Sequence, residues 1–177
     1  MAISSRLPKQ KEILSVYAII VLMIYSWTIF KFNYSLPGWL YFLNTGEILS
    51  VFAYSMTTNL LESIFVLFGV VAVSVVLPKK WFADAFITRG VILSILVLGL
   101  MMFVAGQFST WAYYPADIIR WFPAYLVSVG LIAFFAGRIQ FVNKSTEFFA
   151  DRAIIFLYVS IPVSVLSLIA VLIRNII

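Results

Sequence analysis

Five long apolar stretches constrain this chain more than any other feature of its sequence. They occupy residues 13–30, 58–77, 90–108, 121–137 and 153–173. An earlier start of the second helix, near Glu47, stays open as an alternative. A helix of about 20 apolar residues crosses a hydrocarbon core about 30 Å thick, because each residue advances the helix by about 1.5 Å. The pattern therefore predicts an all-α fold, a polytopic bundle of five transmembrane helices that forms one integral membrane domain.

The overall composition agrees with this prediction. Charged residues make up only 11% of the 177 residues and the mean hydropathy is +1.09, whereas about a quarter of the residues of a soluble domain are charged. The lipid bilayer is therefore the first expected partner of the chain. The five stretches leave little sequence for a soluble domain.

The connecting segments carry their own signals. Pro37 and Gly38 interrupt the pattern after the first stretch, and the aromatic residues that follow predict an interfacial segment over 36–56. Residues 138–152 alternate charged and aromatic side chains, which predicts a short amphipathic helix on the membrane surface. The first stretch follows basic residues as a signal peptide does, but it is longer than such a segment usually is, so we expect it to remain as a helix.

The basic residues are distributed unevenly among the loops. Three lie in loops on one predicted side of the membrane (Lys31, Arg120 and Arg174), and the other nine of the twelve lie on the opposite side. Short cytoplasmic loops are enriched in Lys and Arg, so the count predicts an N-terminus inside and a C-terminus outside. An odd number of spans is needed for this arrangement. We expect a plasma membrane protein, of the prokaryotic (inner) membrane type.

Two residue types are missing altogether, and their absence excludes several chemistries. The chain has no Cys and no His, which removes disulfides, thiolate chemistry, His-based catalytic dyads and the commonest metal ligand. The net charge of +5 comes from clusters beside the apolar stretches, which is typical of membrane topology and not of nucleic-acid binding. We expect no nucleic acid, metal or other cofactor.

Five polar residues are predicted to lie at a similar depth in the outer leaflet. Counting along the helices places Glu62 about 22 Å, Arg120 about 25 Å and Gln107 about 27 Å from the inner boundary. Asn59 shares the helix face of Glu62, and Asp117 precedes Arg120 by one helical turn. A charged side chain inside a bilayer costs at least about 2.5–3.5 kcal/mol, so each needs a partner or a function.

Two interpretations of this group remain open at the level of sequence. In the structural interpretation, Glu62 and Arg120 neutralise each other and hold two helices together. In the functional interpretation, Glu62, Asn59, Gln107, Asp117 and Arg120 form an outward-facing site for a polar ligand, a lipid head group or a proton.

Small residues and one proline predict details of helix packing. Gly130, Ala133 and Gly137 recur at helical spacing, as do Gly69 and Ala72, which favours close approach of helices. Pro162 lies in the middle of the last stretch and predicts a kink there.

The sequence contains no catalytic constellation. The small size and the lack of a soluble domain favour a non-enzymatic accessory subunit that binds another membrane protein. One alternative is a transporter or a substrate-binding or lipid-binding module with its site around Glu62 and Arg120. A second alternative is a membrane enzyme that acts on a lipid-linked substrate, for which a carboxylate would have to serve as acid or base.

Overall fold

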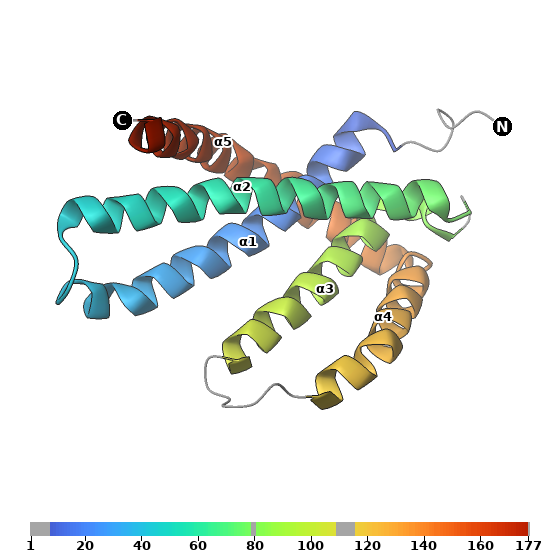
Figure 1. The fold of residues 1–177 in the computed structure, drawn as a ribbon. Helices are drawn as coiled ribbons and strands as arrows, with labels where there is room; N and C mark the ends of the chain where they lie inside the picture. The colour runs from blue at the N-terminus through green and yellow to red at the C-terminus, as the bar shows by residue number, and fades with distance from the viewer. Residues whose placement is uncertain (1–7, 79–80, 109–115, 177) are drawn as a thin grey trace.

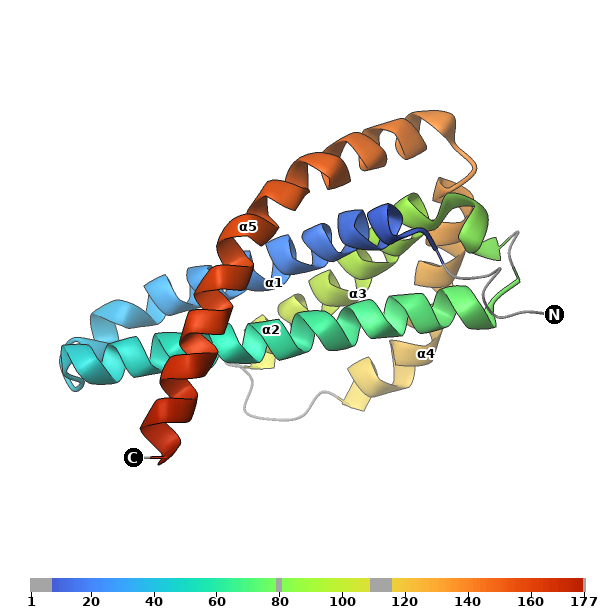
Figure 2. The same ribbon diagram turned by 90° about the horizontal axis from the view of Figure 1, so that it is seen from above.

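The computed structural model describes residues 8–78, 81–108 and 116–176, with the backbone alone for 107–108 and 116–119. The described residues form five α-helices and a short 3-10 helix, with no strand. They are α1 (Gln10–Trp39), α2 (Thr45–Val76), η3 (Ala83–Ala85), α3 (Phe86–Phe108), α4 (Ala116–Ala136) and α5 (Gln140–Ile176). Consecutive helices run back and forth across the molecule, and the start of α1 and the end of α5 lie at opposite ends (Figure 1, Figure 2). The all-α bundle predicted from the sequence is confirmed.

The lengths of the helices fit a membrane protein. Within the described residues, four helices are long and apolar enough to cross a membrane, namely α1, α2, α3 with η3, and α5. The fourth helix along the chain, α4, contributes a shorter apolar stretch, Arg120–Ala136. The class of protein is therefore a helical membrane bundle, while the number of spans and their orientation stay predictions.

The centre of the bundle is α1. It packs against α2, α3 and α5, and the side chains of Val16, Ala18 and Ile20 have no exposed surface at all. By contrast, α4 packs mainly against α3, and most of its described side chains are exposed. The described core is thus organised around the first helix of the chain.

Hydroxyl groups join α1 to its neighbours. Tyr17 is bonded to Ser63 of α2 at 3.2 Å, and Tyr25 to Ser164 of α5 at 2.5 Å. Each serine also donates its proton to a carbonyl of its own helix, so the tyrosine hydroxyl is the donor between the helices. An interhelical bond of this kind inside a membrane stabilises a bundle by about 0.6 kcal/mol on average.

The helix α2 begins earlier than the apolar stretch that predicted it. Asn44 accepts a hydrogen bond from the backbone N–H of Glu47 at 2.9 Å, and Glu47 accepts one from the backbone N–H of Asn44 at 2.8 Å. This capping box starts the helix at Thr45, which agrees with the alternative start near Glu47 and not with a start at residue 58. The expected interfacial connection over 36–56 is therefore mostly helical, because α1 also continues through Pro37 to Trp39.

The last helix unites two elements that the sequence separates. The predicted surface helix over 138–152 and the span over 153–173 form one helix, α5, from Gln140 to Ile176. Neither glycine nor proline occurs between Gln140 and Pro162, so nothing ends the helix at the membrane surface. Asp151 also fastens this part to α1, because it accepts a hydrogen bond from Ser15 at 3.0 Å and pairs with Lys11 at 3.5 Å. Figure 2 shows α5 bending along its course, as expected of a helix that contains Pro162.

The small residues expected to allow close helix approach, in and next to α4 and in α2, differ in their surroundings. Ala133 is buried at 2% exposure, and a side chain at Gly137 would run into the guanidinium of Arg89. A Cβ at Gly130 or Gly69 would meet no other atom within 4 Å. The expectation of close helix approach is therefore correct for Gly137 and wrong for Gly130 and Gly69.

Candidate functional site

A cavity of about 440 Å³ lies between α1, α2 and α3. Its walls are mostly apolar, with two polar side chains among the ten that line it. The lining residues are Ile24, Trp27 and Thr28 of α1, Glu62, Phe65 and Val66 of α2, and Leu98, Met101, Met102 and Ala105 of α3. Cavities that hold small organic ligands are commonly about 300–1,000 Å³ and mainly apolar, with a few polar groups that orient the ligand.

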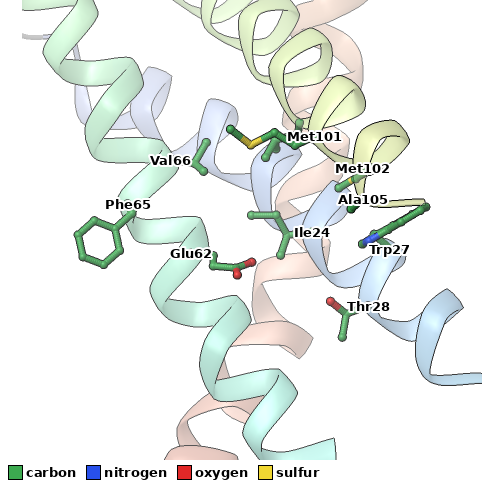
Figure 3. A pocket seen from close by; sticks show the side chains of 10 residues that line it. Ile24, Trp27, Thr28, Glu62, Phe65, Val66, Met101, Met102 and Ala105 are labelled. Atoms are coloured by element: carbon green, nitrogen blue, oxygen red, sulfur yellow. The ribbon is translucent and has the colours of Figure 1, made fainter. Parts of the chain in front are cut away.

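Glu62 is the charged group of this cavity. Figure 3 shows its carboxylate pointing from α2 into the space in front of α1, with the hydroxyl of Thr28 on the opposite wall and the ring of Phe65 turned away. The side chain is exposed, and the one ion pair among the described residues joins Lys11 to Asp151. Thus no described basic side chain neutralises Glu62.

Asn59 supports the wall behind Glu62. Its side chain is 3% exposed, and its Oδ1 accepts a hydrogen bond from the hydroxyl of Thr28 at 2.9 Å. The Nδ2 of Asn59 is buried without a hydrogen-bond partner among the described residues. A buried donor of this kind costs about 1–3 kcal/mol. Asn59 is therefore close to the cavity through Thr28, but it does not line it.

The predicted group of five residues is only partly assembled. Glu62 and Asn59 lie one turn apart on α2, as expected. Arg120 is exposed near the start of α4, which packs mainly against α3, and it forms no ion pair with Glu62. The side chains of Gln107 and Asp117 lie outside the described residues, although their backbones belong to α3 and α4. A role of these residues in ligand binding stays a prediction.

Residues on α1 complete the cavity, and the sequence search did not select them. The indole ring of Trp27 lies under the ammonium group of Lys31, with 5.1 Å from Nζ to the ring centroid. One face of this ring is therefore already covered by a cation. Thr28 is the polar lining residue that the sequence did not reveal. A hydroxyl inside a helix can bond to its own backbone, so it costs little in a bilayer and does not stand out as a charged or amide side chain does.

The arrangement can bind a molecule that is mostly apolar and carries one polar group. A carboxylate accepts hydrogen bonds and attracts cations, and its interactions are stronger where water is scarce. Among the described residues, no cluster of three or more Asp or Glu side chains could hold a metal ion. We find no match to the chain among protein-family models, curated proteins or solved structures.

Proposed function

We propose that this membrane protein is a binding module for an amphiphile with a protonated amine. The amine lies at the carboxylate of Glu62, and the apolar body of the ligand fills the cavity between α1, α2 and α3. The observation that carries the proposal is a carboxylate that pairs with no described basic side chain, in a cavity whose other lining residues, Thr28 apart, are apolar or aromatic.

The charge of Glu62 is the first argument for an amine. Keeping a carboxylate ionised at membrane depth costs at least about 2.5 kcal/mol, and a bound cation offsets that cost. The three N–H groups of a primary ammonium suit the acceptors that are present, namely the Glu62 carboxylate and the Thr28 hydroxyl oxygen. The hydroxyl of Thr28 already donates to Asn59, so its oxygen is available as an acceptor.

The remaining walls are the argument for an apolar body. Leu98, Met101 and Met102 present flexible or branched apolar side chains along α3. Methionine adapts to ligands of different shape because it is unbranched and polarisable. A chain or ring system of moderate size therefore fits the cavity better than a sugar or a small ion does.

Binding of octylamine and of octanol to the detergent-solubilised full chain tests the proposal, because these probes share an apolar chain and differ in charge. Calorimetric titration of the unaltered protein is expected to show octylamine bound at least about tenfold more tightly than octanol. In Glu62→Gln this preference disappears. Glu147→Gln is the matched control, because Glu147 is an exposed carboxylate of α5 outside the cavity. Equal affinity of the unaltered protein for both probes, or an equal loss in both variants, contradicts the proposal.

The accessory role, which composition favours, does not conflict with this proposal. An accessory subunit can bind an amphiphile and present it to a partner. A transporter or an enzyme acting on a lipid-linked substrate also needs such a site. These roles stay predictions, as do the N-terminus on the cytoplasmic side and the plasma membrane location.

A further inference from the structure

A second cavity, of about 320 Å³, lies where α1 meets α2 and α5. Figure 2 shows α5 crossing over α1 and α2. The residues of α1 that line this cavity are Leu22, Tyr25, Ser26 and Ile29. The residues of α1 that line the cavity at Glu62 are Ile24, Trp27 and Thr28. A helix has about 3.6 residues per turn, so the two sets lie on opposite sides of α1. No residue lines both cavities.

The polar side chains of the second cavity all carry hydroxyl groups. They belong to Tyr25 and Ser26 of α1 and to Ser160 of α5, and none of the described lining residues is charged. The cavity at Glu62 differs in this respect, because it contains a carboxylate. A charged ligand would lose its hydration in the second cavity without finding a counter-charge. The second cavity therefore suits an uncharged ligand.

Ser160 has a hydroxyl group that the rest of the bundle leaves unused. The residue is 9% exposed, and its hydroxyl forms no hydrogen bond to any described residue. By contrast, the hydroxyl of Ser164, one turn later, donates to the carbonyl of Ser160 at 2.8 Å, which is a common arrangement for a serine inside a helix. A buried hydroxyl without a partner costs free energy. A ligand oxygen that accepts a hydrogen bond from Ser160 would remove that cost.

Tyr25 supplies a hydrogen-bond acceptor beside this donor. Its hydroxyl donates to Ser164 at 2.5 Å, because the proton of Ser164 is already donated to the carbonyl of Ser160. The phenolic oxygen of Tyr25 therefore acts toward a ligand as an acceptor. The cavity thus offers a donor at Ser160 and an acceptor at Tyr25. A neutral hydroxyl group, which both donates and accepts, complements the pair.

Aromatic rings indicate the shape of the apolar part of the ligand. Tyr25, Phe52 and Phe156 line the cavity from three different helices. Aromatic side chains contact other rings by offset stacking or by their edges, so rings contributed by three helices favour a flat ring system over a flexible chain. Phe156 and Val159 are exposed in addition to lining the cavity. The cavity therefore opens on the outer surface of the bundle, which faces lipid in a membrane.

We propose that the second cavity binds a flat, uncharged ring compound that carries a hydroxyl group. Ser160 donates a hydrogen bond to the ligand hydroxyl, and the ligand hydroxyl donates to the phenolic oxygen of Tyr25. The ring system lies among the rings of Tyr25, Phe52 and Phe156, and the ligand enters from the lipid. The site shares no residue with the cavity at Glu62, so each of the two proposals can fail without the other.

Three naphthalene compounds test the proposal, because they share a flat ring system and differ in their polar group. They are 2-naphthol, naphthalene itself and the 2-naphthoate anion. Calorimetric titration of the full chain in a mild detergent, with protein-free micelles as the blank, is expected to show 2-naphthol bound about tenfold more tightly than the other two. Binding of either other compound as tightly as 2-naphthol would overturn the proposal.

Ser160→Ala tests the donor, and Ser167→Ala is its matched control. Ser167 is also a buried serine of α5, at 7% exposure, and it does not line the cavity. In Ser160→Ala the affinity for 2-naphthol is expected to fall by about threefold to tenfold, while the affinity for naphthalene is unchanged. In Ser167→Ala both affinities stay near those of the unaltered chain. An unchanged affinity for 2-naphthol in Ser160→Ala, or an equal loss in the two variants, contradicts the proposal.

Val159→Trp tests the shape of the site without removing a polar group. Val159 is 64% exposed and lines the cavity, so a larger side chain there obstructs the opening without entering the core. Both 2-naphthol and naphthalene are expected to bind at least about tenfold more weakly. Val165→Trp is the control, because Val165 is an exposed valine of α5 outside the cavity. Unchanged binding in Val159→Trp would place the compounds elsewhere and would overturn the proposal.

Glu62→Gln separates this proposal from the function proposed above. The affinity for 2-naphthol is expected to stay unchanged in this variant, because Glu62 lines the other cavity. A loss of affinity would place 2-naphthol in the cavity at Glu62 and would overturn the second site. The preference of the Glu62 cavity for an amine is measured independently with octylamine and octanol.

Discussion

The helices α1 and α4 are both mainly apolar, yet α1 lies at the centre of the bundle and α4 lies at its edge. Three other helices surround α1, whereas α4 packs mainly against α3. Side-chain hydrogen bonds join α1 to both α2 and α5. In the described part of α4, the hydrogen bond to another helix runs from the hydroxyl of Tyr125 to the carbonyl of Leu96.

The difference shows which residues decide the position of a membrane helix. Lipid tails are as apolar as leucine, so an apolar surface alone gives a helix no reason to leave the lipid. Serine, threonine and tyrosine hydroxyls that find partners across helices do give such a reason. The inner helix of this bundle is the one with more of these partners.

The largest expected difference between the two helices concerns added volume. Ala18 of α1 has no exposed surface, while Ala124 of α4 is exposed. Leucine at position 18 overfills a packed site and is expected to destabilise the bundle by about 1–3 kcal/mol. Leucine at position 124 faces outward and changes stability by less than about 0.5 kcal/mol. Thermal unfolding in a mild detergent, followed by circular dichroism, measures both. Equal losses would show that α4 is as enclosed as α1.

A second, smaller difference concerns polar partners. Thr28→Val in α1 leaves the Oδ1 of Asn59 without its donor, and we expect a loss of about 1 kcal/mol. Adding Asn59→Leu removes the buried amide altogether, so the double variant is expected to recover most of that loss. Ser128→Ala is the control in α4, because this exposed hydroxyl bonds to the carbonyl of Tyr125 in its own helix. Simply additive losses in the Thr28 and Asn59 variants would contradict the pairing.

The smallest expected effect distinguishes two glycines. A Cβ at Gly130 of α4 meets nothing within 4 Å, so Gly130→Ala is expected to stabilise the helix by about 0.5–1 kcal/mol. A Cβ at Gly90 of α3 comes within 3.2 Å of Val16 and 3.3 Å of Val70. This crowding removes the same gain, so Gly90→Ala is expected to be no more stable than the unaltered chain. The same unfolding measurement compares them, and a gain at position 90 equal to that at 130 would show looser packing around α1.

The sequence predicts the helices well because apolar length is a local property. It predicts their ends less well, and the start of α2 shows why. The first part of that helix, from Thr45, is more polar and aromatic than the later part, so hydropathy does not reveal it. The pair Asn44 and Glu47 carries the signal instead, as a capping box. This pair decides in favour of the alternative start near Glu47, which hydropathy alone leaves open.

The candidate site was harder to predict because it depends on which helices are neighbours. Glu62 and Arg120 have similar predicted depths, but depth in the membrane does not say whether their two helices are neighbours. The neighbours of Glu62 across the cavity come from α1 and α3, and Thr28 is the polar one among them. The sequence marks Glu62 as exceptional, whereas only the packing of α1 against α2 reveals its surroundings.

The continuity of α5 has a mechanical consequence. A helix of 37 residues is about 55 Å long, which exceeds the about 40–45 Å of a bilayer with its head groups. The part of α5 from Gln140 up to Pro162 has no break at which a surface segment could turn independently of the span. If the part of α5 that Asp151 joins to α1 tilted, the helix would therefore move as one rigid segment as far as Ser160. The helix would bend at Pro162 to accommodate this motion.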